Sequence, residues 1–278
     1  SAHLSKILFS SLMDQIIYNK FQLIYHQYKF LKYLEFLMRI DGRENLSLRD
    51  TTIEINTNKY ADGSCIISCG DTKVLCTATV EETVPFFLRK SGLGWVTAEY
   101  GMLPRSTDTR IRREASAGKQ SGRTLEIQRL IGRSLRTCID RSCLGERQIV
   151  IDCDVLQADG GTRCASITGG WVVLRLAINK LLASGKLSED PLINQVAALS
   201  CGVVEGVTMT DLNYSEDSNA DIDSNFVMNE KNEFVEIQCS AEKSTLTKNQ
   251  FEEIYDMATS GILKLFDIQK ESLKSEKI

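Results

Sequence analysis

A glycine pair is the first feature of this sequence whose residue types could do chemistry. The stretch 157–163 reads Gln-Ala-Asp-Gly-Gly-Thr-Arg, follows the apolar run 149–151 and leads into an apolar helix that we expect from Ser166. The outward N–H groups of a glycine turn, a helix N-terminus, a threonine hydroxyl and an arginine fork all suit a phosphate group. An ordinary strand-to-helix turn can contain the same glycines, so the stretch alone leaves both interpretations open.

Clustered aspartates form a second candidate site. Asp217, Asp221 and Asp223 fall in one acidic segment, and Asp211 lies at the end of the strand predicted before it. On an extended chain Asp221 and Asp223 point the same way, so a cation or arginines must relieve their repulsion. Mg²⁺ suits such a cluster, because it binds a few carboxylates together with water and substrate phosphates. A solvated acidic loop is the alternative.

Positive charge is concentrated in the middle of the chain. Residues 89–136 contain eleven Lys or Arg and four Asp or Glu, a net charge of +7. Residues 205–236 contain nine acidic residues and one Lys, a net charge of −8. A basic stretch of this density needs a polyanion, an acidic partner, or the acidic half of its own chain.

Part of this charge lies in a stretch without apolar periodicity, residues 105–121, which we expect to be a solvated and mobile loop. Arginines on such a loop can reach a flexible phosphate backbone and adapt to it, whereas a salt-bridged surface loop is the alternative. The loop arginines are Arg105, Arg110, Arg112 and Arg113.

Arg123 stands at the start of a second predicted helix. Apolar residues at helical spacing predict this helix at about residues 124–140, with Ser121 or Thr124 as its N-cap. Arg123 would then lie at the positive end of the helix dipole, where an anion is favoured.

Histidine and cysteine usage limits the possible chemistry. The two histidines are His3 and His26, so residues 38–278 cannot contain a Ser-His or Cys-His nucleophile system. Nine cysteines at irregular spacing, without a Cys-x-x-Cys pair, favour reduced core cysteines over disulfides or zinc. Any catalysis there must use carboxylates, arginines, backbone donors or a metal ion. No window approaches about 18 uncharged apolar residues, so we expect no membrane span.

Apolar patterning and turn residues predict the elements that would position these groups. The helix predicted at 248–270 begins with the capping box Thr247-x-x-Gln250. The other predicted helices are 124–140 and 166–182, and the predicted strands are 52–55, 64–68, 73–80, 95–100, 149–151, 195–204, 207–212, 225–228 and 233–239.

Several long segments, taken together, closely resemble the ribonuclease PH family of phosphorolytic exoribonucleases. Even residues 38–43, Met-Arg-x-Asp-Gly-Arg, look like the usual start of that family, and the resemblance extends to about residue 270. The matching motifs are SCGDTKVLCTA at 68–78, GWVTAEYGMLPR at 94–105, GKQSGRTLEIQRLIGR at 118–133, DCDVLQADGGTR at 152–163 and EDSxADxD at 216–223.

The resemblance implies an α+β fold of mixed or antiparallel sheets packed with helices. It implies an enzyme, a phosphate-dependent 3′→5′ exoribonuclease that trims tRNA precursors, releases nucleoside diphosphates and adds nucleotides in reverse. It further implies Mg²⁺, inorganic phosphate as co-substrate, RNA as partner, a hexameric ring built as a trimer of dimers, and a cytoplasmic location.

The resemblance also implies residue roles. Phosphate would bind to Arg123, Gly161, Thr162 and Arg163. Asp217 and Asp223 would be the catalytic and metal-binding aspartates, and Arg105, Arg110 and Arg113 would hold the RNA. Phosphorolysis needs no histidine, since phosphate is already an anionic nucleophile. Arginines and a metal must instead offset the repulsion between two anions.

This sequence departs from the family pattern at two places near the expected site. Asn219 stands where the family usually has alanine, and residues 239–245 replace a more glycine-rich stretch. An inactive RNA-binding subunit of an exosome-like ring is the main alternative function, although such subunits typically lose part of the site set that is complete here. A small-molecule phosphotransferase would leave the arginine loop unexplained.

Residues 1–37 differ from everything that follows, with two acidic residues, many large apolar ones and no arginine. A transit peptide would normally be richer in arginine. We interpret residues 1–37 as an appended segment, 38–272 as a single domain and 273–278 as a tail.

Overall fold

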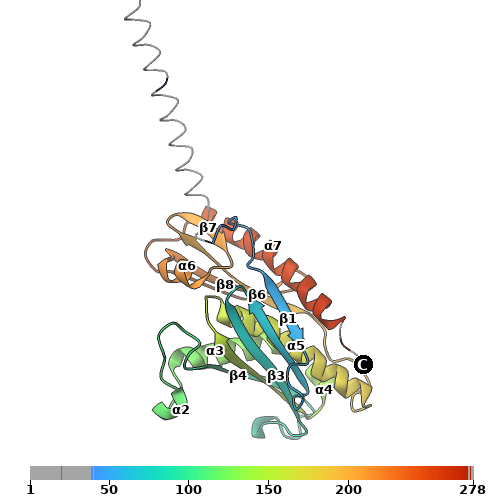
Figure 1. Cartoon of the computed structure of the whole chain (residues 1–278). Coiled ribbons are helices and arrows are strands. Elements are labelled where there is room, and N and C mark those ends of the chain that lie inside the picture. The colour runs from blue at the N-terminus through green and yellow to red at the C-terminus, as the bar shows by residue number, and fades with distance from the viewer. Residues whose placement is uncertain (1–19, 21–38, 40, 275, 277–278) are drawn as a thin grey trace, which may run out of the picture. The chain divides into compact units, whose positions relative to one another are not determined.

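The computed structural model describes residues 20, 39, 41–274 and 276. The chain divides into two compact units, residues 1–45 and 46–278. Within the described part of the first unit, Arg43 Nε pairs with Asp41 Oδ2 at 2.7 Å. The expectations about residues 1–37 lie outside the described residues, apart from Lys20. The sheets, the long helices and the candidate site lie within the unit 46–278 (Figure 1).

A five-stranded sheet in the order β1-β2-β3-β5-β4 forms one layer. Neighbouring strands of this sheet are antiparallel, except for β4 and β5. These two pair in parallel from Trp95↔Gln148 to Met102↔Val155. Alternate residues of β5 are buried, which places one face of the sheet in the core. The strands are β1 Thr51–Ile55, β2 Gly63–Cys69, β3 Thr72–Glu81, β4 Trp95–Met102 and β5 Gln148–Gln157.

A second, antiparallel sheet has the order β7-β6-β8-β9. Every residue of β6 except Val204 is buried, because helices cover both faces of this sheet. The strands are β6 Val196–Val204, β7 Val207–Thr210, β8 Ile222–Asn229 and β9 Phe234–Ala241.

Helix α5, Thr162–Ala183, lies between the two sheets. It contacts β2 and β3 on one side and β6 on the other, and it is apolar on nearly all faces, as expected of a helix buried on all sides. Helix α7, Lys248–Leu273, covers the opposite face of the second sheet, and Ile254, Ala258 and Ile262 pack there. Helix α3, Gly122–Arg136, packs beside α5 on β4. Figure 1 shows α7 in red along the second sheet and α5 in yellow below it.

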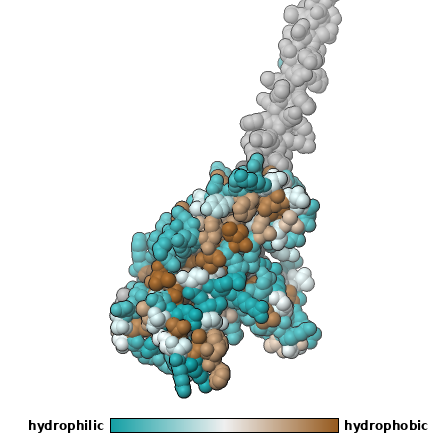
Figure 2. All heavy atoms as spheres, turned by 180° about the vertical axis from the view of Figure 1, so that it is seen from behind, coloured by the Kyte–Doolittle hydropathy of each residue, from teal (hydrophilic) through white to brown (hydrophobic). Residues whose placement is uncertain are grey.

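Short helices complete the chain: η1 Phe86–Leu88, α2 Glu114–Ala117, α4 Arg141–Leu144 and α6 Tyr214–Asn219. No described helix is long and apolar enough to cross a bilayer. In the view of Figure 2, the surface of this unit is mainly hydrophilic, with separate hydrophobic patches.

The expected α+β class is confirmed, and the predicted strands and long helices are present with different bounds. The helix predicted at 124–140 ends at Arg136, and the strand predicted at 225–228 begins at Ile222. The strand predicted at 149–151 is much longer, Gln148–Gln157. The helix expected from Ser166 already begins at Thr162, because Gly161 with φ 66° supplies the turn into it. The acidic segment is not extended throughout: Asn213 and Glu216 form a capping box that starts helix α6.

Candidate active site

One cavity of about 640 Å³ gathers six of the predicted site residues. Its wall combines the turn before α5, the start of α3, helix α6, strand β8 and part of the loop 105–113. The predicted residues in that wall are Arg123, Gly161, Thr162, Arg163, Asp217 and Asp223. Elements far apart in the sequence therefore meet at one place, with basic groups and carboxylates in the same cavity.

The glycine turn presents an open helix N-terminus to the cavity. Gly160 and Gly161 have φ angles of 76° and 66°, a region that strongly favours glycine. No side chain caps helix α5 at Gly161. In the described part of the chain, no protein acceptor receives a hydrogen bond from the N–H groups of residues 160–163. These donors and the positive end of a 22-residue helix are suited to bind an anion.

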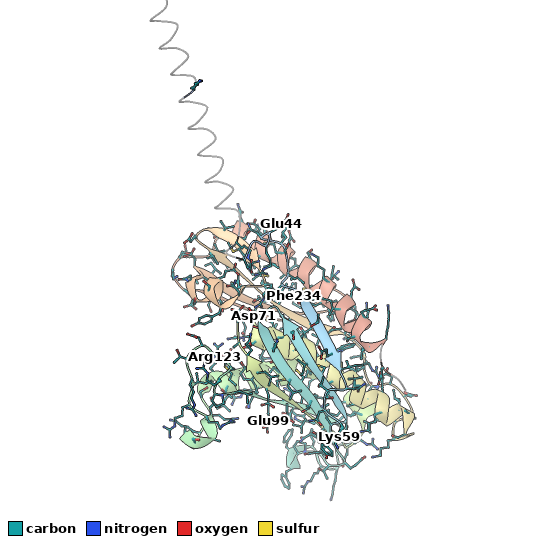
Figure 3. The ribbon with its side chains drawn as sticks, viewed as in Figure 1. Glu44, Lys59, Asp71, Glu99, Arg123 and Phe234 are labelled. Carbon is teal, nitrogen blue, oxygen red and sulfur yellow. The ribbon has the colours of Figure 1, made fainter. Side chains whose placement is uncertain are left out.

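Arg123 enters the cavity from helix α3, as predicted. Ser121 is the N-cap, because its side chain accepts a hydrogen bond from the Thr124 N–H at 3.1 Å. Arg123 is exposed and lies in the first turn of that helix. Its position is labelled in Figure 3. The start of a second helix thus places a guanidinium group in the wall of the same cavity.

The two predicted metal-binding aspartates come from different elements. Asp217 lies on α6 and Asp223 on β8, and both line the cavity. Asp221 does not join them: its carboxylate accepts a hydrogen bond from the Gly206 N–H at 3.2 Å. Asp221 precedes strand β8 and does not line the cavity, so of the three clustered aspartates only Asp217 and Asp223 are available there for a cation.

Both carboxylates are ionised less readily than usual. Burial raises the pKa of Asp217, although the charges of Arg123 and Arg163 oppose the rise. Burial, followed by repulsion from Asp217, raises the pKa of Asp223 to about 6. Two half-buried carboxylates that repel each other are suited to share a divalent cation.

No described group of three or more His, Cys, Asp or Glu side chains could enclose a metal ion. Two carboxylates nevertheless fit Mg²⁺, which commonly binds through one or two carboxylates and completes its shell with water and substrate phosphates.

The loop arginines do not line the cavity. Arg105, Arg110 and Arg113 are exposed, while Thr107, Asp108, Thr109 and Ile111 of the same loop form part of the wall. Arg105 Nη1 donates to the backbone oxygen of Asp108 at 2.8 Å. Among the described residues, no ion pair joins these three arginines to a carboxylate, so their charge faces solvent. The basic range 89–136 and the acidic range 205–236 do contact each other elsewhere, since Arg133 Nε pairs with Glu236 Oε2 at 2.7 Å.

Two departures from the family pattern contact each other. Lys243 Nζ donates to the backbone oxygen of Asn219 at 2.7 Å, at the C-terminal end of α6. Asn219 Nδ2 donates to the backbone oxygen of Ser215 within the same helix. Both contacts support the helix that carries Asp217, and neither side chain enters the cavity.

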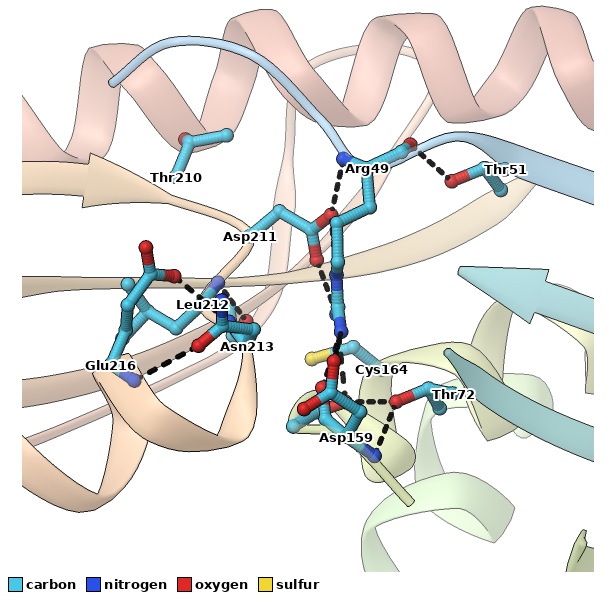
Figure 4. Close-up of polar contacts among 12 residues, drawn as sticks. Arg49, Thr51, Thr72, Asp159, Cys164, Thr210, Asp211, Leu212, Asn213 and Glu216 are labelled. Carbon is cyan, nitrogen blue, oxygen red and sulfur yellow. Dashed lines mark hydrogen bonds and ion pairs between the residues drawn. The ribbon is translucent and has the colours of Figure 1, made fainter. Parts of the chain in front are cut away.

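Sequence reasoning missed a buried ion pair behind the glycine turn. Asp211 was grouped with the metal-binding aspartates, but it instead accepts hydrogen bonds from the Arg49 guanidinium at 2.7 and 3.1 Å (Figure 4). The pair joins residues 162 positions apart. The only signal in the sequence is an arginine just before the first strand, which is too common to be informative.

Comparison with known protein families agrees with the fold and the cavity and identifies the class of protein. A profile described as "3′ exoribonuclease family, domain 1" matches residues 47–178, and the one for domain 2 matches residues 194–261. The chain belongs to this family, and within it to the ribonuclease PH group of phosphate-dependent 3′→5′ exoribonucleases.

Individual relatives agree with this assignment. A ribonuclease PH of Roseobacter denitrificans is 58% identical over 233 residues, which cover 84% of this chain and 98% of the relative. A ribonuclease PH of Caulobacter vibrioides is 59% identical over 236 residues, which cover 85% and 99%.

More distant solved structures share the fold. The Archaeoglobus fulgidus exosome with RNA bound to the active site has a chain that is 22% identical, with a TM-score of 0.71 over 85% of this chain and 94% of that one. Rice Rrp46 is 17% identical, with a TM-score of 0.69 over 84% and 100%.

Proposed function

We propose that the cavity binds inorganic phosphate against the 3′-terminal phosphodiester of an RNA. One observation carries this proposal: two helix N-terminal regions with arginines, Arg123 and Arg163, and two carboxylates, Asp217 and Asp223, line the same cavity. The free N–H groups of residues 160–163 and the Thr162 hydroxyl would hold the phosphate from one side, and Arg123 from another.

Within this site a phosphate oxygen attacks the phosphorus of the last phosphodiester, and the 3′ oxygen of the penultimate nucleotide leaves. The products are a nucleoside diphosphate, whose β-phosphate comes from the inorganic phosphate, and an RNA one nucleotide shorter. The phosphate is already an anion, so the protein must mainly position it and reduce charge repulsion. Guanidinium groups and backbone donors in a partly enclosed cavity do both.

Asp217 and Asp223 would hold Mg²⁺ in this cavity. Bound there, Mg²⁺ would neutralise charge on the phosphodiester and on the leaving oxygen. The two aspartates would be catalytic in this sense, because their carboxylates would hold that positive charge in the cavity.

The exposed arginines Arg105, Arg110 and Arg113 would contact the RNA backbone beyond its last nucleotide. Their unpaired charges suit a phosphate chain, and the same loop lines the cavity where that chain would end. By family, the substrate would be the 3′ end of tRNA precursors, the assembly a hexameric ring made as a trimer of dimers, and the location the cytoplasm.

The alternative of an inactive RNA-binding ring subunit predicts the loss of some cavity residue. All six of the predicted phosphate-binding and acidic residues are instead present and converge. This convergence supports an active enzyme over a purely structural subunit.

Arg123→Ala tests the phosphate site. Because Arg123 would contact the attacking phosphate, the substitution should raise KM for phosphate by on the order of tenfold or more while KM for RNA changes little. Arg129→Ala is a matched control, since Arg129 is an exposed arginine of the same helix outside this cavity. Steady-state rates with phosphate and RNA varied separately provide the measurement. An equal rise of both KM values in Arg123→Ala would contradict the assignment.

A further inference from the structure

Arg49 is a buried arginine directly behind the glycine turn, and its role is not explained by the proposed reaction. Its side chain is 6% exposed. Nη2 and Nε bind the two oxygens of Asp211 at 2.7 and 3.1 Å, and the backbone N–H of Arg49 binds Asp211 Oδ2 at 2.8 Å. Such a two-pronged, buried pair holds the guanidinium plane in one orientation.

The remaining donors of the guanidinium reach the glycine turn (Figure 4). Nη1 donates to the backbone oxygen of Asp159, and Nη2 lies 3.5 Å from that of Gly160. Nη1 also lies 3.8 Å from the Asp159 carboxylate. Four of the five N–H donors of the guanidinium group thus donate hydrogen bonds within the protein. Arg49 does not line the cavity, so it acts from behind the glycine turn.

Because the peptide group is planar, these contacts also determine where the neighbouring N–H groups point. In a trans peptide the N–H points opposite to the C=O of the preceding residue. The carbonyls of Asp159 and Gly160 both face Arg49, so the N–H groups of Gly160 and Gly161 face away from it. These glycines line the cavity, and their N–H groups have no protein acceptor among the described residues.

Thr72 on β3 supports the same orientation from another element. Its Oγ1 donates to the Gly160 oxygen at 2.7 Å and accepts from the Asp159 N–H at 2.9 Å. The Asp159 carboxylate in turn accepts from the Tyr214 N–H at 3.1 Å, at the start of α6. One network therefore connects the phosphate-binding turn with the helix that carries Asp217.

We propose that Arg49, held by Asp211 and assisted by Thr72, is a positioning residue that orients the peptide groups of the glycine turn toward the attacking phosphate. This inference rests on the phosphate site proposed above. Lysine cannot replace Arg49 here, because an ammonium group is a point charge and cannot bind Asp211 and two carbonyls at fixed angles. The Gly160 and Gly161 N–H groups then lose their common direction.

The first test compares Arg49→Lys with Arg175→Lys. Arg175 is also partly buried and paired, with Asp190, but it lies four turns further along α5. For Arg49→Lys we expect KM for phosphate to rise on the order of tenfold, since small misplacements of binding groups are costly, with KM for RNA within about twofold. Arg175→Lys should leave both KM values unchanged. An unchanged KM for phosphate in Arg49→Lys, or an equal rise of both KM values, overturns the inference.

A second pair keeps the inference testable if Arg49→Lys does not fold. Thr72→Val has nearly the same shape but loses both hydrogen bonds, and Thr72→Ser retains the hydroxyl. We expect Thr72→Val to raise KM for phosphate and Thr72→Ser to restore it. A Thr72→Val protein with wild-type KM for phosphate overturns the inference. A wild-type reaction without any phosphate requirement overturns the proposed function itself, and the inference with it.

Discussion

Carboxylates and arginines in the cavity act on each other at the scale of single side chains. Asp217 is kept from a larger pKa rise by Arg123 and Arg163, whereas Asp223 faces both burial and the charge of Asp217. This arrangement costs stability in the absence of a cation and becomes favourable once a cation binds. The long motifs predict Asp217, Asp223, Arg123 and Arg163 as residues of one site, and the structure brings all four to one cavity.

Asp223→Asn should stabilise the protein without divalent metal, and more so at high pH. In the unfolded chain Asp223 ionises near 3.8, but in the folded protein only near 6. Its contribution to stability is therefore full at low pH and is lost as the pH rises through about 6. We expect Asp223→Asn to raise Tm most at about pH 8 and clearly less at about pH 4.5, because the loss of stability begins above the unfolded value of 3.8 and is complete only above about 6. Thermal melts in EDTA provide the measurement.

Asp62→Asn is the control of opposite sign for this prediction. Burial opposes ionisation of Asp62, but the hydrogen bonds from Lys180 and the Val80 N–H, together with the charges of Lys180 and Lys186, outweigh it and lower the pKa of Asp62. Stability from Asp62 is therefore present at high pH and lost on acidification, so Asp62→Asn should lower Tm at about pH 8. A Tm gain for Asp223→Asn that is the same at both pH values would contradict the assigned environment of Asp223.

At the scale of elements, the site depends on where helices begin. α5 begins at Thr162 and not at the expected Ser166, so Thr162 and Arg163 lie in its first turn, next to the free N–H groups. Apolar periodicity could not show this, because the first turn contains polar residues that also suit a loop. Helix α6 was missed for a similar reason: it is short and polar, and its capping box was hidden within an acidic run. The start of α3 was predictable, since Ser121 precedes a clear apolar repeat.

Ser121→Ala should affect both stability and phosphate binding, whereas Thr247→Ala should affect stability alone. Each residue is an N-cap, Ser121 of α3 and Thr247 of α7, so each substitution should lower the free energy of unfolding by about 1 kcal/mol. Of these two helices, only α3 carries a residue of the proposed phosphate site, Arg123. Urea unfolding and KM for phosphate are the two measurements. A raised KM for phosphate in Thr247→Ala would show that general loosening, and not the start of α3, controls the site.

At the scale of the whole molecule, the two sheets and the helix between them bring distant segments together. Arg49 and Asp211 are 162 residues apart, and Thr72 and Gly160 are 88 apart, yet all four meet behind one turn. Local periodicity predicts strands and helices but not such contacts, because they depend on how the second sheet packs against α5. The family resemblance predicted the fold and six of the residues that line the cavity. It supplied nothing about the network that holds the glycine turn.

Transfer of labelled phosphate tests the central claim most directly. Purified protein is incubated with Mg²⁺, radiolabelled inorganic phosphate and an RNA with a single-stranded 3′ tail, and the products are separated. We predict RNAs shortened from the 3′ end and nucleoside diphosphates that carry the label in the β-phosphate, with no shortening when phosphate is left out. Nucleoside monophosphates as products, or equal shortening without phosphate, would contradict the account.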